Sequence, residues 1–370
     1  MNPLSLHNLV PEHVRRFEPY TPSRPDPVLM RMYGVEHLHR LNNNENALGP
    51  PDAARKAIEA FHSERAAVYP SGDCFLLREA LADRFGKLPE QFLVGNGSCE
   101  VITSVIKAFC GPGDNIVTAD KTFAVYEWVA EFSGFEARLT PLREHAFDPE
   151  AMLAAMDART KVAFVCNPNN PTGTYWSESE LCAFMDAVDN RCIVVVDEAY
   201  LEYVDKPDFP DGMRLMERYP NLVVFRTFSK MYGLAALRIG YLCASQEVVD
   251  IVRRTHIVYS VNTQAQTAAA AAIADDAEHI AATRRMVAEG RAVLEGCFSR
   301  LGLEFVSGEG NYVMARAPLS DTLLYRKLMK RGYMVRTMTG FRFPNWIRVS
   351  LVHRPVLEGF CRALEDVLRG

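Results

Sequence analysis

Short apolar runs alternate with amphipathic stretches of helical length, and this pattern constrains the fold of the chain more than any other feature. Between Pro51 and Ala268 the runs have the length of strands, and many are apolar at consecutive positions. Strands of that kind are buried on both faces, as in a parallel sheet covered by helices. The runs are FLV (92–94), NIV (115–117), VAFVC (162–166), CIVVVD (192–197), NLVVF (221–225) and RIGYLCA (238–244). The pattern therefore predicts an α/β fold with a mostly parallel sheet.

The two ends of the chain differ from this middle segment. Residues 1–50 are rich in Pro, Asn and Arg, which is typical of an extended arm and loops. The stretch Thr263–Phe298 has few helix breakers and predicts one or two long helices, followed by the strands YVMARA and WIRVSLV. A chain of 370 residues also exceeds the usual limit for one core. We expect a large domain over residues 51–268, a small α+β domain over 269–370, and an arm that joins the small domain.

The overall charge and composition exclude several classes of protein. The net charge is -5, with 41 basic and 46 acidic residues and no long basic run, so no nucleic-acid partner is expected. No run approaches the length of a membrane span, and acidic and Pro residues interrupt the first twenty positions, so we expect a cytoplasmic protein. Nine cysteines are scattered singly, which predicts neither a disulfide framework nor a zinc site.

The residues that follow each strand matter most, because ligands of such sheets collect at the carboxyl ends of the strands. After the first run, GNGSCEVI predicts a helix that begins near Ser98. The free N–H groups of Ser98 and Cys99 at that helix start are able to hold a phosphate. The segment lacks the lysine of a Walker loop and the spacing of a dinucleotide fingerprint. By itself, it is explained more simply as an ordinary helix-capping turn.

Two further strands end in polar residues. VAFVCNPNNPTG runs into two prolines and a glycine, which predicts a rigid loop that presents Asn170, although turn chemistry alone also explains the motif. CIVVVDEAY places Asp197 at the end of an apolar strand, where a charged carboxylate is costly unless a cation or donors meet it. That partner is either the protonated ring nitrogen of pyridoxal 5'-phosphate (PLP) or the backbone of the following turn, which Asp197 would cap.

The segment NLVVFRTFSKMYGLAALR combines several groups that suit a phosphate ester. Thr227 and Ser229 supply hydroxyls, and Arg238 supplies a guanidinium eight residues after Lys230. Apolar neighbours on both sides of Lys230 favour a lowered pKa and hence a nucleophilic amine. A lone lysine in a loop is ordinarily solvated, but these neighbours favour a functional role.

In chain order these segments resemble the class I/II (fold-type I) PLP-dependent aminotransferases, which carry NPTG, D-x-x-Y and S-x-K followed by an arginine. The resemblance implies a large domain with a mostly parallel seven-stranded sheet and a smaller α+β domain. It implies that Lys230 holds PLP covalently and moves a proton, that Asp197 pairs with the ring nitrogen, and that Asn170 and Tyr200 bond the ring oxygen. The residues expected around the cofactor phosphate are Ser98, Cys99, Thr227, Ser229 and Arg238.

One aromatic side chain should cover the cofactor ring, because KTFAVY (121–126) matches the segment that supplies this cover in the family. Its place after Thr122 assigns the role to Phe123 instead of Tyr126. Within the family, the chain is most similar to the histidinol-phosphate aminotransferases, over nearly its whole length. RAAVYPSGD then places Tyr69 where the family sends a tyrosine to the neighbouring cofactor phosphate, which implies a homodimer. The residues implied to bind substrate are Tyr20, Asn44, Arg336 and Arg348.

The resemblance implies transamination of L-histidinol phosphate with 2-oxoglutarate, giving imidazole-acetol phosphate and L-glutamate, in histidine biosynthesis. Two arginines suit a pocket that accepts a dicarboxylate and then a phosphate ester. The chain departs from the family at Ala47, where proline is usual, and at VYSVN (258–262), where PYNVN is common. Both segments flank the substrate side, so they bear on substrate identity.

Other functions remain open at this point. An aromatic amino acid aminotransferase, a threonine-phosphate decarboxylase and an aminotransferase of a specialised pathway would all keep Lys230. A PLP-binding regulator would usually bring a DNA-binding module, for which the 370 residues leave no space. A nicotinamide-dependent dehydrogenase is disfavoured because no G-x-G-x-x-G follows any of the strands.

Overall fold

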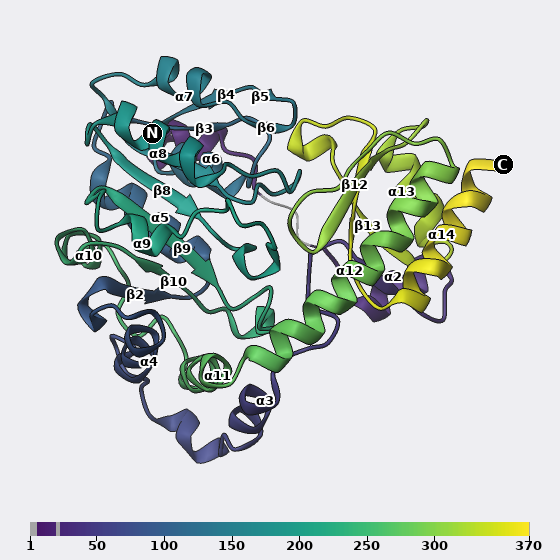
Figure 1. Ribbon diagram of the computed structural model, residues 1–370, viewed down its shortest axis with the longest axis horizontal. Helices are drawn as coiled ribbons and strands as arrows, with labels where there is room; N and C mark the ends of the chain where they lie inside the picture. Colours follow the sequence, from purple (N-terminus) through teal and green to yellow (C-terminus); the bar gives the residue numbers. More distant parts are fainter. Residues whose placement is uncertain (1–5, 20–22, 370) are drawn as a thin grey trace, which may run out of the picture.

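The computed structural model describes residues 6–19 and 23–369, which form two lobes around separate sheets (Figure 1). The larger sheet has seven strands, and β10 alone runs antiparallel to its neighbours. Across the sheet the order is β2 (Phe92–Gly95), β10 (Gly240–Cys243), β9 (Leu222–Thr227), β8 (Ile193–Asp197), β7 (Thr160–Cys166), β3 (Asn115–Ala119) and β4 (Glu136–Thr140). The predicted fold class, with a mostly parallel seven-stranded sheet, is confirmed.

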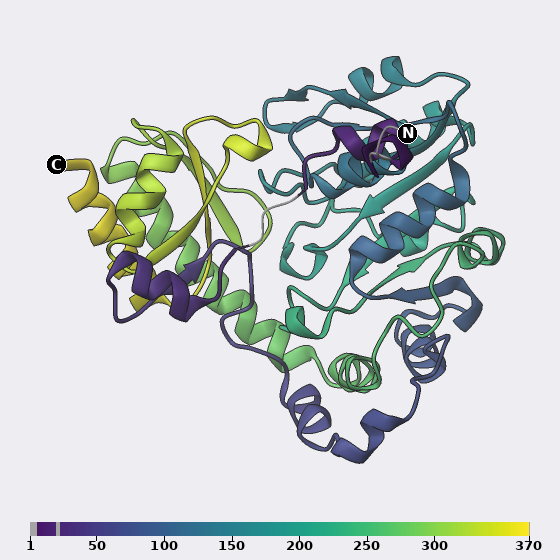
Figure 2. The same ribbon diagram turned by 180° about the vertical axis from the view of Figure 1, so that it is seen from behind.

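Helices lie on both faces of this sheet, as the front and back views show (Figures 1 and 2). They are α3 (Asp52–Glu59), α4 (Phe75–Phe85), α5 (Ser98–Phe109), α6 (Val125–Phe132), α7 (Pro149–Ala155), α8 (Glu178–Val188), α9 (Gly212–Leu215), α10 (Gln246–Arg253) and α11 (Thr263–Ala274). Every residue of β3, β9 and β10 is buried, and β7 and β8 each have a single partly exposed residue. None of the described helices is both long and apolar enough to cross a membrane.

The small lobe is discontinuous in sequence. Its five strands are, in order, β1 (His39–Leu41), β13 (Tyr333–Thr337), β14 (Trp346–Ser350), β12 (Tyr312–Arg316) and β11 (Phe305–Val306). Its helices are α2 (Asp26–Tyr33), α12 (Ala277–Arg300), α13 (Asp321–Met329) and α14 (Arg354–Arg369). Because β1 pairs with β13, the end of the N-terminal arm belongs to this sheet.

The long stretch near residue 270 forms two helices, α11 and α12, that break at Asp275 and Asp276. The domain boundary expected between residues 268 and 269 falls inside α11. This helix packs against α3 and α4 of the large lobe. We therefore propose that the boundary lies at residues 275–276 instead.

The two lobes meet along a seam where their backbones touch directly. The N–H of Glu309 in the small lobe donates a hydrogen bond of 2.6 Å to the carbonyl of Gly173 in the large lobe. A Cβ placed on Gly308 would lie 2.2 Å from the carbonyl carbon of Gly173, so no side chain fits there. The hydroxyl of Tyr312 donates to the Asn169 carbonyl at 2.6 Å. These contacts hold the small sheet against the loop that follows β7.

Candidate active site

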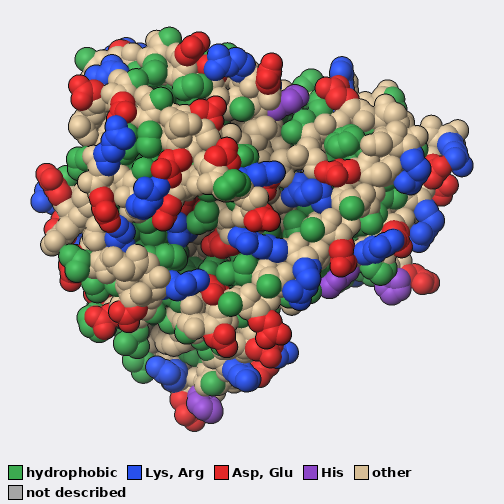
Figure 3. All heavy atoms as spheres, viewed as in Figure 1, with side chains coloured by type: hydrophobic (Ala, Val, Ile, Leu, Met, Phe, Trp, Pro, Cys, Tyr) green, Lys and Arg blue, Asp and Glu red, His purple; other side chains and the backbone are tan. Residues whose placement is uncertain are grey.

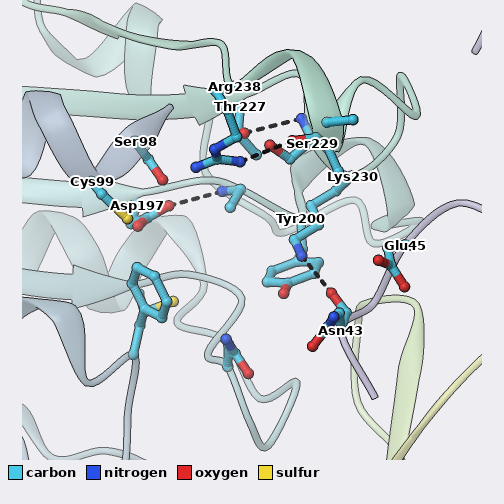
Figure 4. A pocket seen from close by; sticks show the side chains of 16 residues that line it. Asn43, Glu45, Ser98, Cys99, Asp197, Tyr200, Thr227, Ser229, Lys230 and Arg238 are labelled. Carbon is cyan, nitrogen blue, oxygen red and sulfur yellow. Dashed lines mark hydrogen bonds between the residues drawn. The ribbon is translucent and has the colours of Figure 1, made fainter. Parts of the chain in front are cut away.

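A cavity of about 410 Å³ lies at the carboxyl ends of β7, β8 and β9, where a doubly wound sheet is expected to bind its ligand (Figure 4). Ten residues singled out from the sequence line it, although they come from five separate segments of the chain. They are Ser98, Cys99, Phe123, Asn170, Asp197, Tyr200, Thr227, Ser229, Lys230 and Arg238.

One end of the cavity is built to bind an anion. Helix α5 begins at Ser98 directly after β2, so its first N–H groups are not used within the helix. The Arg238 guanidinium lies close above Gly97, where a Cβ would come within 2.5 Å of Nη2. Thr227 Oγ1 accepts the N–H of Ser229 at 3.1 Å, which brings both hydroxyl residues to this end (Figure 4). Helix N–H groups, hydroxyls and a guanidinium together suit a phosphate.

Lys230 reaches into the middle of the cavity, toward Tyr200 and Asn43 (Figure 4). Its Nζ donates a hydrogen bond of 2.8 Å to the Asn43 carbonyl. Burial lowers the pKa of Lys230 to about 8, and the positive charges of Arg348 and Arg238 act in the same direction. An amine with this pKa is partly neutral near physiological pH, so it is able to act as a nucleophile or a base.

Asp197 lies at the end of β8 with only 3% of its surface exposed. The hydroxyl of Tyr126 donates to its Oδ2 at 2.6 Å, and the N–H of Ala199 donates to Oδ1 at 3.1 Å. Burial raises the pKa of Asp197, while these two hydrogen bonds and Lys230 oppose the rise. The carboxylate is therefore poised for one further partner, and a cation would stabilise it most.

Tyr126 is a residue whose role the sequence did not reveal. It was weighed only as the cover of a ring, in place of Phe123. In the structure Phe123 lines the cavity, whereas Tyr126 is fully buried and stacks on Phe164 with ring centroids 4.6 Å apart. Phe123 lies just before α6 and Tyr126 lies in its first turn, from which its hydroxyl reaches Asp197. The need of Asp197 for a donor was the signal that pointed to such a neighbour.

The loop after β7 is held by a network of buried hydrogen bonds. Asn169 is completely buried, and its side chain bonds Thr122 Oγ1 at 2.7 Å and Thr172 Oγ1 at 2.9 Å. This network fixes the next residue, Asn170, at the rim of the cavity. The Asn170 Oδ1 accepts a hydrogen bond from Arg348 of the small lobe.

Asn44 lies behind the cavity and does not line it. Its Nδ2 donates to the Tyr200 hydroxyl at 2.9 Å, and its Oδ1 accepts from Ser350 at 3.1 Å. The residue is 1% exposed, so its side chain has no free surface to offer a ligand. The expected contact with substrate is therefore replaced by a proposal that Asn44 positions Tyr200.

Arg348 stands at the seam between the lobes and is also buried. Its Nη2 donates to the Asn42 carbonyl at 2.8 Å, and its guanidinium lies 5.4 Å from the ring of Tyr312. Among the described residues no hydrogen-bond partner is found for its Nε. Burial lowers the pKa of Arg348. A buried guanidinium with an unused N–H is an incomplete site that an anion would complete.

Charged side chains of both signs gather along the centre of the molecule, where the lobes meet (Figure 3).

Arg336 and Tyr69, like Asn44 and Arg348, are not among the residues that line this cavity. Arg336 lines a neighbouring cavity of about 470 Å³ that Arg24 also lines. Tyr69 is 81% exposed and lines a separate groove, with its ring 5.2 Å from that of Tyr259. Tyr20 lies outside the residues that the structure describes.

Several residues that line the cavity were not anticipated. They are Asn43, Glu45, Cys166, Ala199, Ala235 and Ala236. Asn43 and Glu45 belong to the dense amide segment NNNEN, which sequence reasoning treated mainly as a loop. Glu45 lies at the side of the cavity opposite the anion-binding end (Figure 4). Across the described residues, no group of three or more His, Cys, Asp or Glu side chains is placed to hold a metal ion.

Comparisons with known proteins agree over nearly the whole chain. The family model described as "Aminotransferase class I and II" matches residues 36–364. A histidinol-phosphate aminotransferase of Anaeromyxobacter sp. is 40% identical over 366 residues, which are 97% of this chain and 99% of that protein. Histidinol-phosphate aminotransferase 2 of Pseudomonas aeruginosa is 39% identical over 359 residues, which are 96% of this chain and 96% of that protein.

Solved structures show the same fold at lower identity. The histidinol-phosphate aminotransferase of Sinorhizobium meliloti, solved in complex with pyridoxal-5'-phosphate, superposes with a TM-score of 0.86 at 23% identity over 97% of each chain. A double mutant of the Thermus thermophilus aspartate aminotransferase superposes with a TM-score of 0.82 at 23% identity over all of both chains. The same two-lobed architecture thus serves proteins named for different substrates.

Proposed function

This chain belongs to the class I and class II aminotransferases, and on that premise we propose that it transfers the amino group of L-histidinol phosphate to 2-oxoglutarate. The products are imidazole-acetol phosphate and L-glutamate, and the reaction is a step of histidine biosynthesis. The observation that carries this choice of substrate is the full-length identity of 38–40% to proteins named for that activity.

We propose pyridoxal 5'-phosphate as the cofactor, because the cavity offers a matching group for each part of it. The anion-binding end around Arg238 and the start of α5 suits the phosphate, and Asp197 suits a protonated ring nitrogen. Lys230 enters the same cavity from the side opposite Asp197, with an amine suited to the aldehyde (Figure 4). Gly240 keeps the approach to Ser98 open, since a Cβ there would lie 2.9 Å from the Ser98 nitrogen.

Each side chain then has a definite task. Bound pyridoxal phosphate supplies the electron sink that lowers the barrier to breaking the Cα–H bond. Lys230 Nζ takes the proton from the substrate Cα and delivers it again on the other side of the reaction. Asp197 stabilises the positive charge of the ring nitrogen, and Tyr126 keeps the Asp197 carboxylate oriented toward it.

The remaining groups orient the reactants. Asn170 and Tyr200 donate hydrogen bonds to the cofactor ring oxygen, and Asn44 holds Tyr200 in place. Phe123 covers one face of the ring. Arg348 binds the carboxylate of glutamate, and Arg336 binds the more distant anionic group, whether carboxylate or phosphate.

We further propose a cytoplasmic homodimer in which Tyr69 reaches the cofactor phosphate of the neighbouring subunit. Tyr69 is too exposed to act within its own subunit, and apolar side chains such as Val68, Leu76 and Val258 are exposed in the same region. Apolar groups on a surface mark sites of association. A mass of one chain in solution, measured by light scattering, would contradict the dimer, and a membrane-bound fraction after cell lysis would contradict the location.

The substrate is tested by single-turnover experiments with the cofactor-loaded protein. We expect L-histidinol phosphate to convert the cofactor rapidly, whereas histidinol without its phosphate, phenylalanine, tyrosine and threonine phosphate react slowly. A preference for phenylalanine or tyrosine would reassign the enzyme to aromatic amino acids. No reaction with any of them would point to a specialised substrate.

The pH dependence of cofactor attachment follows from the lowered pKa of Lys230. With a pKa of about 8, roughly 10% of the amine is neutral at pH 7, against about 0.03% for an ordinary lysine. The rate at which added pyridoxal phosphate binds covalently to cofactor-free protein should therefore rise about tenfold per pH unit up to pH 8 and level off above it. Stopped-flow absorbance between pH 6 and 10 measures this profile, and a midpoint near 10.5 would refute the expected environment of Lys230.

A further inference from the structure

One turn of the small lobe crosses the seam and touches the large lobe. This turn, η6 (Thr339–Phe341), connects β13 to β14, the strands that carry Arg336 and Arg348. Its base is rigid because the buried carboxylate of Asp321 accepts the N–H groups of Met338 and Thr339 at 2.9 and 2.8 Å. The small lobe therefore holds the base of the turn, but these bonds do not reach its far end.

Phe341, at the end of this turn, lies between the two arginines proposed to bind substrate. The centre of its ring is 5.5 Å from Cζ of Arg336 and 5.9 Å from Cζ of Arg348. Both distances fall within the range of cation–π attraction. The position of this ring thus influences where each guanidinium is held.

The next residue, Arg342, fastens the turn to the large lobe. Its Nη1 and Nη2 donate to the two carboxylate oxygens of Glu127 at 2.9 and 2.6 Å, and Nη1 also donates to the Asp120 carbonyl at 2.9 Å. Arg342 adopts a left-handed backbone with φ of 61°, which a non-glycine residue enters only at a cost. Glu127 is a good acceptor because its side chain is only 13% exposed.

Glu127 also ties this contact to the chemistry of the cavity. It follows Tyr126 in α6, and Tyr126 holds Asp197. An exposed ion pair is ordinarily worth little. This one is bidentate and has a third acceptor on the backbone. It joins the two lobes beside the contact of Lys121 with the Phe343 ring, so it is placed to affect the site.

We propose that Arg342 is a positioning residue that clamps η6 onto Glu127 and Asp120, so that Phe341 sets the spacing of Arg336 and Arg348. The clamp acts mainly on the substrate side of the cavity, because the groups that it positions are Phe341 and the two arginines beside it. The choice of substrate rests on the function proposed above, but the clamp itself does not.

The test compares Arg342→Gln with Arg316→Gln in the cofactor-loaded enzyme. Arg316, at the end of β12, serves as the matched control, because its Nη1 forms an exposed ion pair with Oε2 of Glu304 at 3.2 Å. Arg342→Gln should raise KM for both the amino donor and 2-oxoglutarate about three- to tenfold with kcat nearly unchanged. Hydrogen exchange of residues 338–343 should become faster, and Arg316→Gln should alter neither quantity.

A charge swap separates the clamp from a mere effect on folding. Arg342→Glu and Glu127→Arg should each raise KM, and the double variant should recover part of the loss, because the ion pair forms again with reversed polarity. Unchanged exchange at residues 338–343 together with unchanged KM would overturn the clamp, as would a double variant in which the two losses simply add. If exchange at residues 338–343 became faster but the enzyme preferred another amino acid to histidinol phosphate, the clamp would be supported. The proposal of histidinol phosphate as substrate would then be rejected.

Discussion

Lys230→Ala should lower kcat/KM by about 10⁴-fold or more, because one substitution removes the amine that we propose both anchors the cofactor covalently and moves the Cα proton. The protein should still fold. The side chain makes one hydrogen bond, to the Asn43 carbonyl, and burial already disfavours its charged form. Thermal unfolding and cofactor absorbance measured on the same sample separate loss of chemistry from loss of structure.

Two controls sharpen this result. Lys161→Ala removes a lysine that is 38% exposed and paired with Asp114, and it should leave both activity and cofactor attachment unchanged. A small primary amine such as methylamine should restore part of the proton transfer to Lys230→Ala, since the empty space admits it. Turnover with glutamate that survives in Lys230→Ala would refute the assignment of the base.

Asp197→Asn should reduce kcat by about 10²- to 10³-fold while the cofactor still binds through its phosphate. The amide keeps the shape of the carboxylate and an oxygen for Tyr126, but it has no charge with which to hold a proton on the ring nitrogen. The loss should therefore appear in kcat more than in the cofactor dissociation constant. Pre-steady-state kinetics and fluorescence titration measure the two quantities.

The milder variant Tyr126→Phe tests the hydrogen bond between Tyr126 and Asp197 without altering Asp197 itself. It removes one hydrogen bond to Asp197 and leaves the charge, so a loss of about tenfold is expected. The stacking of the ring on Phe164 is preserved, which keeps the packing intact. If Asp197→Asn and Tyr126→Phe had equal effects, the charge of Asp197 would not be the important factor.

Sequence reasoning succeeded where polar residues stand at the ends of apolar strands. Asp197 and Lys230 were predicted to share a site because parallel strands end at one edge of a sheet, and both line the same cavity. Strand β4 was missed because its sequence, EARLT, is largely polar and only its last residue is buried at the edge of the sheet. A strand that exposes most of its residues has no apolar run, so the sequence pattern does not indicate it, whereas the buried edge strand β2 was predicted.

Contacts between distant segments were beyond the reach of sequence patterns. Nothing in the sequence of Arg342 or Glu127, separated by 215 positions, indicates that they meet. Asn43 accepts the hydrogen bond of Lys230 with its backbone carbonyl. Because every residue type carries that group, the identity of residue 43 does not indicate the contact. Asn44 was expected to bind substrate from its place in a motif, and the structure adds a contact that the motif does not indicate, the hydrogen bond to Tyr200.

The division of the site between two sheets has a consequence for how such an enzyme acquires new specificities. The groups proposed to hold the cofactor project from the seven-stranded sheet, whereas Arg336 and Arg348 project from the five-stranded one. We expect substitutions in β13 and in the turn after it to alter which amino compound is accepted, with little effect on the shared amine chemistry. Strand β14 is more constrained, because its Arg348 bonds Asn170 of the large lobe. Changes confined to β13 and that turn would therefore allow such an enzyme to gain new substrates while it retains one inherited reaction centre.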